Sequence, residues 1–182
     1  MPQSNLSKGV SSEDAPAVEQ PFSPMYAPRH SRMNPEQVVL LVEDNPDDVE
    51  LMRLAFEKND IQCTFVVARD GQEALDYFNG KGIHAERDPS VLPRLVLLDL
   101  NVPKIDGLEV LRRVRAKDPA RTVPIVVLSS SKQDEDVRRS YELGANSYVR
   151  KPVDFREFVE ATRLLAAYWL GLNELPVEGE RQ

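Results

Sequence analysis

Four predicted strands each end in a side chain that can do chemistry. In chain order, these side chains are Glu43 with Asp44, then Asp99, Ser129 and Lys151. Short apolar runs such as Leu95 to Leu98 are typical of strands buried on both faces of a parallel sheet. The carboxyl ends of such strands share one edge, which is where open α/β sheets bind ligands. We therefore expect these side chains to come together at that edge.

Acidic side chains brought together in this way indicate a cation site. Neighbouring carboxylates resist ionisation unless a cation compensates, and Mg2+ is a hard ion that prefers oxygen ligands. We predict Asp44 and Asp99 as carboxylate ligands and the backbone carbonyl of Asn101 as a third ligand. Glu43 is predicted to bind through water or to tune the site. With the metal bound, Asp99 is a candidate nucleophile toward a phosphoryl group, whose charge Mg2+ and Lys151 would neutralise.

Each of these side chains also has an ordinary structural explanation. Glu43 and Asp44 fit a polar exit from a strand, and Asp99 fits a turn cap. Ser129 fits a helix-capping hydroxyl as well as a donor to a phosphoryl oxygen, and Lys151 fits a solvated lysine before a turn. The joint pattern favours chemistry, because the structural explanation requires a separate coincidence at each strand end.

The elements that must position these residues alternate along the chain. Strands are predicted at 38–42, 64–68, 95–98, 124–128 and 147–150, and helices begin near Pro46, Gly71, Leu108, Asp134 and Asp154. Such alternation implies parallel strands joined by right-handed crossovers. The predicted fold is a three-layer α/β sandwich, flavodoxin-like, with a doubly wound five-stranded parallel sheet of order 2-1-3-4-5 and five helices.

The 182 residues are expected to hold one such domain, at 37–172, between two tails. Residues 1–36 carry six of the 14 prolines and no hydrophobic period, so we predict a flexible extension. Residues 173–182 form a short acidic tail, too short for an effector domain or a DNA-reading helix-turn-helix. Output is therefore expected to go through protein contacts.

Charge and composition exclude several classes of partner. The net charge of -7 argues against a nucleic-acid or anionic-membrane surface. No apolar run is long enough to span a membrane, and the amino terminus does not resemble a secretion signal. The single cysteine, Cys63, allows no intrachain disulfide and is expected to be a small buried hydrophobe. We expect a cytoplasmic protein with no nucleic-acid and no membrane partner.

The ordered motifs resemble the receiver domain of two-component response regulators. The matching segments are VVLLVEDNPDD (38–48), LVLLDLNVPKIDG (95–107), PIVVLSSS (124–131) and GANSYVRKPVD (144–154). The resemblance implies these roles: Asp99 as phosphoacceptor, Glu43 and Asp44 as the acidic pair, Asn101 as the metal-binding carbonyl, Ser129 and Tyr148 as the switch residues, and Lys151 as the phosphate-binding lysine. Pro152 is similar to the family's usual cis proline. The chain departs from the pattern in having Glu-Asp as its acidic pair and a longer loop at 80–93.

That loop, the ending Tyr168-Trp169-Leu170 and the segment RSYELGANSYVRKPVD (139–154) are similar, more narrowly, to receivers associated with phytochromes. This resemblance implies a light-sensing histidine kinase as phosphodonor, and homodimers formed through helix 4, strand 5 and helix 5. It also implies a protein that catalyses its own phosphorylation and dephosphorylation without turning over a separate substrate.

The last helix supports an interface independently of the resemblance. One of its faces is the core stripe expected of any such helix. A second apolar stripe is left over, formed by Ala161, Leu164, Tyr168 and Leu172. Apolar side chains that widen a helix face beyond what one sheet can cover suggest a partner, although stray surface hydrophobes would give the same pattern.

Other functions fit the sequence less well. Aspartyl phosphohydrolases commonly need an acid two positions after the nucleophile, where this chain has Asn101. A scaffold with a vestigial site would not need Asp44, Asp99, Ser129 and Lys151 together. Gly80-Lys81-Gly82 lacks the spacing of a nucleotide-binding loop. His84 is expected to be a solvated loop residue rather than a phosphorelay histidine.

Overall fold

A single parallel sheet forms the centre of the molecule in the computed structural model, which describes residues 37–176. Its strands lie in the order β2-β1-β3-β4-β5, as predicted. Their bounds are β1 Val38–Val42, β2 Thr64–Ala68, β3 Leu95–Leu98, β4 Ile125–Ser129 and β5 Ser147–Arg150. The predicted extension at 1–36 and the end of the predicted acidic tail, 177–182, lie outside the described residues.

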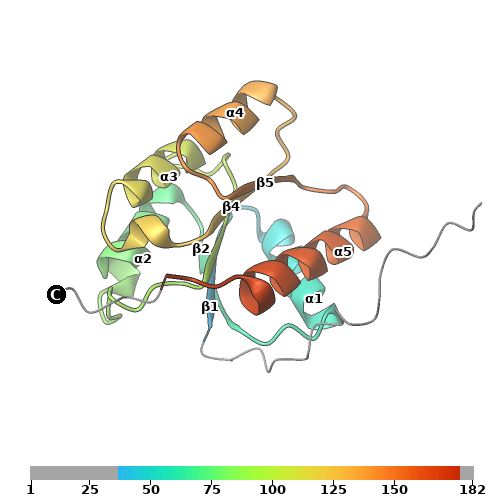
Figure 1. The fold of residues 1–182 in the computed structure, drawn as a ribbon, viewed down its shortest axis with the longest axis horizontal. Helices are drawn as coiled ribbons and strands as arrows, with labels where there is room; N and C mark the ends of the chain where they lie inside the picture. Colours follow the sequence, from blue (N-terminus) through green and yellow to red (C-terminus); the bar gives the residue numbers. More distant parts are fainter. Residues whose placement is uncertain (1–36, 177–182) are drawn as a thin grey trace, which may run out of the picture.

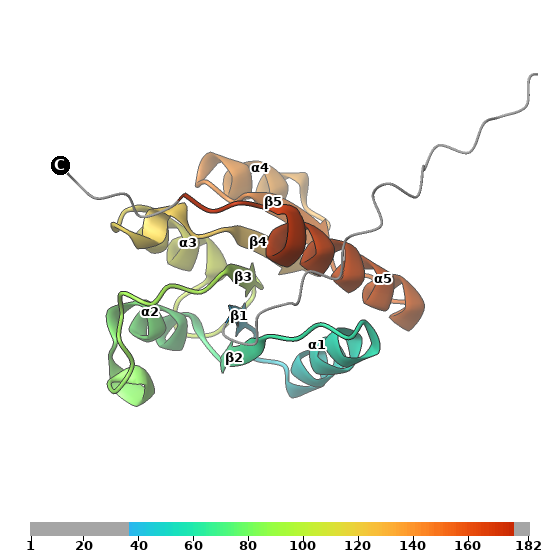
Figure 2. The ribbon, with the colours of Figure 1, turned by 60° about the horizontal axis from the view of Figure 1, so that its bottom comes forward.

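Helices cover both faces of the sheet (Figure 1). Their bounds are α1 Pro46–Lys58, α2 Gly71–Asn79, α3 Gly107–Arg115, α4 Asp134–Glu142 and α5 Phe155–Ala166. Figure 2 shows α1 and α5 on one side of the sheet and α2, α3 and α4 on the other. The predicted three-layer sandwich is therefore confirmed. None of the helices in the described part of the chain is long and apolar enough to cross a membrane.

Alternation along the strands divides the core between the two layers. In β1, Val39 and Leu41 pack with α1 and α5, whereas Leu40 and Val42 pack with α2 and α3. Every residue of β3 is at most 1% exposed, because this central strand is covered on both faces. A strand buried in this way reads as a continuous apolar run.

Polar caps fix where most of the helices begin. Asn45, Asp70, Asp106 and Asp154 each accept a hydrogen bond from a backbone N–H in the first turn of α1, α2, α3 and α5. Such caps satisfy donors that the helix itself leaves unpaired. Since three of these helices follow β1, β2 and β3, the caps also hold the loops at the carboxyl edge of the sheet.

The sequence predicts a last helix that continues to about Leu170, and the structure differs at this end. The α-helix ends at Ala166 and continues as a π-helix over Ala167–Leu172. Leu170, which lies in this π-helix, is only 5% exposed and joins the core with Phe158. After the π-helix, the guanidinium of Arg94 donates a hydrogen bond to the carbonyl oxygen of Asn173.

Two further expectations are wrong. The Lys151–Pro152 peptide bond is trans, and within 37–176 the cis bond is Asp118–Pro119. The side chain of His84 is only 13% exposed, because its ring packs at 5.1 Å from the Tyr77 ring of α2. His84 lies in a short 3-10 helix, Gly82–His84, within the predicted loop, and a second one covers Ala120–Thr122.

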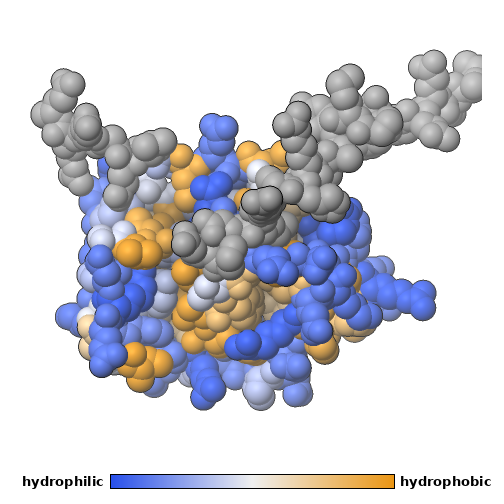
Figure 3. All heavy atoms as spheres, turned by 90° about the horizontal axis from the view of Figure 1, so that it is seen from below, coloured by the Kyte–Doolittle hydropathy of each residue, from blue (hydrophilic) through white to orange (hydrophobic). Residues whose placement is uncertain are grey.

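Apolar side chains are not confined to the core. Figure 3 shows a face on which hydrophobic residues gather toward the middle, with hydrophilic residues on both sides.

Cys63 is half-buried beside the core, and burial raises the pKa of its thiol to about 11. This thiol is therefore protonated at neutral pH and packs as a small apolar group.

Candidate phosphoacceptor and metal site

The predicted side chains do meet at the carboxyl edge of the sheet. Backbone hydrogen bonds continue the strand pairing past the strand ends, from Glu43 N to Ala68 O at 2.9 Å, from Asp99 N to Val42 O at 3.0 Å, and from Lys151 N to Ser129 O at 3.0 Å. The functional residues therefore sit on backbone that is as firmly paired as the sheet itself. Glu43, Asp99 and Ser129 are 3%, 6% and 0% exposed.

Asp99 lies at the centre of this group. Its Oδ1 accepts hydrogen bonds from the backbone N–H of Asn101 at 3.0 Å and from the Ser129 hydroxyl at 3.2 Å. Its Oδ2 accepts one from Lys151 Nζ at 2.6 Å. Gly107 lies against the same residue, since a Cβ there would come within 2.3 Å of the Asp99 carbonyl oxygen. The first residue of α3 must therefore be glycine if the Asp99 backbone is to stay where it is.

Lys151 binds more than Asp99. Its Nζ donates to Glu43 Oε2 at 2.5 Å, to Asp99 Oδ2 at 2.6 Å and to Asp48 Oδ2 at 2.8 Å. Burial alone would lower the pKa of Lys151, but its hydrogen bonds to Asp48, Asp99 and Glu43 outweigh this effect and raise it. Burial raises the pKa of Glu43, and its contact with Lys151 opposes that rise. The ammonium group is thus charged and holds three acids together.

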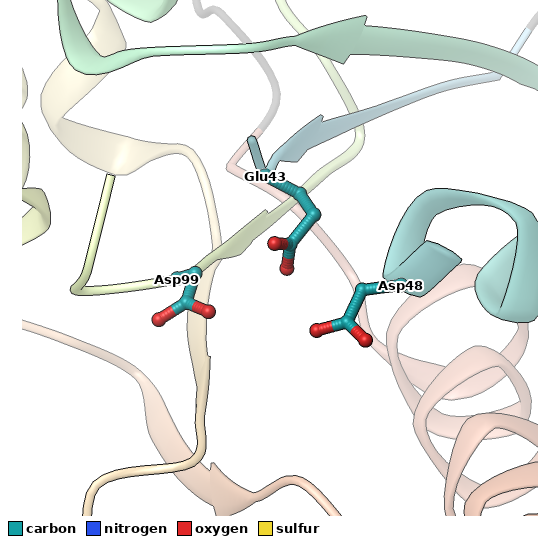
Figure 4. A group of neighbouring side chains, drawn as sticks. All are labelled: Glu43, Asp48 and Asp99. Carbon is teal, nitrogen blue, oxygen red and sulfur yellow. The ribbon is translucent and has the colours of Figure 1, made fainter. Parts of the chain in front are cut away.

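Asp48 is the member of this group that the sequence analysis missed. Figure 4 shows its carboxylate, from the first turn of α1, pointing toward those of Glu43 and Asp99. An oxygen from each of the three lies within 4.8 Å of the others. The available signal was its position, because Asp48 is an acid in the first turn of the helix that directly follows β1 and therefore begins at the carboxyl edge of the sheet.

Asp44 and Asn101 are exposed, and neither side chain belongs to this group. Asp44 instead lines a pocket of about 380 Å³ that it shares with Glu43, Arg53 and Arg69. The roles of Asp44 and of the Asn101 carbonyl as metal ligands stay predictions. So does the role of Tyr148, which is half-buried and donates a hydrogen bond from its hydroxyl to the carbonyl oxygen of Ser131 at 3.3 Å.

The donor set at this edge fits Mg2+. Carboxylate oxygens from separate elements are close enough to share one cation, and Mg2+ favours one or two carboxylates together with water and phosphate oxygens. The loop that carries Asn101 is also held in place, because Pro103 O accepts from Gly71 N at 3.2 Å and Lys104 Nζ pairs with Asp70 at 2.6 Å.

Comparison with known proteins agrees with this geometry. Residues 39–163 match the model of the response regulator receiver domain. The chain is 37% identical over 171 residues to the probable methanogenesis regulatory protein FilR2 of Methanothrix harundinacea, covering 94% of this chain and 98% of that protein. It is 35% identical over 143 residues to the response regulator Rcp1 of Synechocystis, covering 79% and 95%.

Solved structures give the same result. The phosphorylated cyanobacterial phytochrome response regulator RcpA is 34% identical and superimposes with a TM-score of 0.72, covering 78% of this chain and 99% of that one. The Mn2+-bound form of Rcp1 is 33% identical with a TM-score of 0.70 and the same coverage. The structural likeness thus extends to relatives described with a phosphoryl group and with a divalent metal.

Proposed function

Because this chain belongs to the response regulator receiver family and is similar to phytochrome response regulators, we propose that it accepts a phosphoryl group on Asp99 from a sensor histidine kinase. The observation that carries the proposal is the buried Asp99 carboxylate, with Lys151 at 2.6 Å and the Ser129 hydroxyl at 3.2 Å. A cation and a hydroxyl are thus in place beside the nucleophile. Receiver domains are signalling proteins, so no turnover of a separate substrate is expected.

The chemistry follows from these contacts. An Asp99 oxygen attacks the phosphorus of a phosphohistidine, an oxygen–phosphorus bond forms, and the phosphorus–nitrogen bond breaks as the imidazole leaves. Lys151 moves to a phosphoryl oxygen and neutralises part of its charge. Glu43, Asp44, Asp99 and the Asn101 carbonyl would hold Mg2+, which supplies further charge neutralisation when bound.

The message is proposed to leave the site through Ser129 and Tyr148. Ser129 would turn its hydroxyl from Asp99 to a phosphoryl oxygen, and Tyr148 would respond to the space that this movement opens. Phosphorylation adds charge and strong acceptor oxygens at one point, which biases a two-state surface elsewhere. The proposed readout is protein contact rather than nucleic-acid or membrane binding, within the cytoplasm.

Solved relatives that carry phytochrome names, such as RcpA, support a phytochrome-type kinase as donor. We also propose a homodimer through α4, β5 and α5, which the resemblance of the sequence implies. The dimer proposal has its own structural support in α5 and the π-helix, where Leu164, Tyr168 and Leu172 are 55%, 51% and 58% exposed, with Ala161 half-buried beside them. Light scattering of wild type and of Tyr168→Lys tests the dimer proposal. We expect the mass of a dimer for wild type and that of a monomer for Tyr168→Lys. A wild-type protein that is already monomeric contradicts the proposal.

The function is tested by intact-mass spectrometry of protein incubated with acetyl phosphate and Mg2+. We expect one phosphoryl adduct that requires Mg2+ and that Asp99→Asn abolishes. An unmodified wild-type protein would contradict the proposal, and so would equal labelling of Asp99→Asn. Phosphotransfer from purified sensor kinases, beginning with a phytochrome, then tests the identity of the donor.

A further inference from the structure

The ammonium group of Lys151 has no hydrogen-bond donor to spare. A lysine carries three N–H groups, and each one here meets a different carboxylate, from Glu43, Asp48 and Asp99. A phosphoryl oxygen can therefore gain a full hydrogen bond from Lys151 only if one of these carboxylates gives its bond up.

The three carboxylates differ in how readily they can be released. The side chains of Glu43 and Asp99 are 4% and 7% exposed, whereas that of Asp48 is 35% exposed. Its bond to Lys151, at 2.8 Å, is also the longest of the three. Water can solvate the Asp48 carboxylate once it is released, but it cannot reach that of Glu43 without opening the site. Asp99 is the residue that is phosphorylated, and the carbonyl oxygen that it keeps can still accept from Lys151.

We propose that Asp48 is a positioning residue that holds Lys151 in the unphosphorylated protein and is the partner that the lysine exchanges for a phosphoryl oxygen. This inference rests on the proposed function of Asp99 as phosphoacceptor. Asp48 opposes phosphorylation twice, because its bond to the lysine must be broken and because its negative charge faces an incoming anion. It thereby sets how much phosphodonor is needed to occupy the site.

The exchange has a second consequence for the fold. Asp48 belongs to the first turn of α1, whereas Lys151 belongs to the segment between β5 and α5. Their ion pair is a tie between two elements that are distant in sequence, and α1 also packs against α5. Phosphorylation releases this tie, so the proposal places α1 among the elements that respond to the modification.

The test measures the phosphorylated fraction by intact mass over a series of acetyl phosphate concentrations. The Mg2+ concentration is saturating for each variant, which means that more Mg2+ does not increase its labelling. A change in metal affinity therefore does not alter the measured phosphorylated fraction. We expect Asp48→Asn to reach half occupancy at about fivefold less donor than wild type, as the loss of one partly exposed ion pair implies. Asp48→Glu, which retains the charge, is expected to lie nearer to wild type than Asp48→Asn does.

Asp47→Asn is the matched control. Asp47 directly precedes Asp48, and its substitution by Asn removes the same charge. The Asp47 side chain is exposed and forms no ion pair among the described residues. We expect its titration to follow that of wild type. An equal shift in Asp47→Asn would overturn the proposal, because the effect would then be a general one of charge.

A thermal double-mutant cycle tests the tie without phosphorylation. Asp48→Asn is expected to lower the melting temperature more in the wild-type background than in a Lys151→Ala background. Equal changes in both backgrounds would overturn the proposal, as would an Asp48→Asn variant that needs as much donor as wild type or more. A wild-type protein that takes no label overturns the proposed function itself, so the two failures are distinguishable.

Discussion

Two half-buried cations stand at opposite edges of the sheet, and their partners differ. Lys151, at the carboxyl edge, meets three carboxylates. Within residues 37–176, Arg115 at the amino edge meets only neutral oxygens: Gly144 O at 2.7 Å, Val123 O at 2.8 Å, Arg121 O at 3.1 Å and Asn146 Oδ1 at 2.8 Å. Hydrogen bonds to acids raise the pKa of Lys151, whereas burial lowers that of Arg115.

This difference separates a site that can change from one that cannot. The carboxylates around Lys151 carry an excess of negative charge that another cation, or a phosphoryl group with its metal, can reorganise. The oxygens around Arg115 are uncharged and belong to the loops just before β4 and β5, so they offer nothing that a cation or a phosphoryl group would reorganise. Arg115 therefore acts as a clamp for those loops, and Lys151 acts as an exchangeable partner.

The largest effect is expected from Lys151→Ala in metal-free buffer. This change leaves three neighbouring acids without their cation, and losing one partner of a buried ion pair costs about 3 kcal/mol. Added Mg2+ should raise the free energy of unfolding of Lys151→Ala by more than it raises that of wild type, because the metal takes over the neutralisation of the three acids. Urea unfolding with and without Mg2+ measures both values, and a loss that Mg2+ leaves unchanged would contradict the comparison.

Arg115→Ala is expected to cost somewhat less, about 2 kcal/mol, because it leaves several neutral acceptors short of a donor. Mg2+ should give no recovery here, since no carboxylate is uncovered. The same urea titrations provide the measurement. If Mg2+ restored the stability of Arg115→Ala to the same extent as that of Lys151→Ala, the two edges would not differ as proposed.

Gly144→Ala tests the clamp from the backbone side. Gly144 has a φ of +92°, which side chains rarely adopt, and an added Cβ would lie 3.2 Å from Arg115 Nε. We expect a loss of about 1 kcal/mol, seen as a lower thermal midpoint. Phosphoryl labelling of Asp99 should stay normal, because the change is at the far edge. Impaired labelling would show that the edges are coupled.

The smallest effect is expected from Lys104→Met at the rim of the carboxyl edge. The Lys104 side chain is 65% exposed, so solvent screens its pair with Asp70 and the loss of stability should be smaller than in the three variants above. Burial raises the pKa of Asp70, but the hydrogen bonds that its carboxylate accepts from Lys104 and from nearby backbone N–H groups outweigh burial and lower the pKa. The stability that the Lys104–Asp70 pair contributes is therefore fully present at a pH above the usual pKa of aspartate, and it is lost as the pH falls through the lowered pKa of Asp70. Comparing the two proteins in acid titrations, at low and high salt, checks this.

Much of the fold was predictable because its elements carry local signals. The aliphatic runs at β1 and β3 indicated strands buried on both faces, and the Asn45-Pro46 and Asp154 caps located helix starts. The π-helix at the end of α5 was not predictable, because the apolar spacing there also fits a continuing α-helix. The burial of His84 was missed for a similar reason, since it depends on Tyr77 of another element.

The sequence by itself determined that an acid, a hydroxyl and a lysine leave the sheet at one edge, because parallel strands must place their carboxyl ends together. Only the tertiary structure decided which atoms meet there. It placed Asp48, rather than Asp44, against Lys151, because the direction in which α1 leaves the sheet sets where its first turn points. It also gave Arg115 its neutral partners, which come from loops far apart in the sequence.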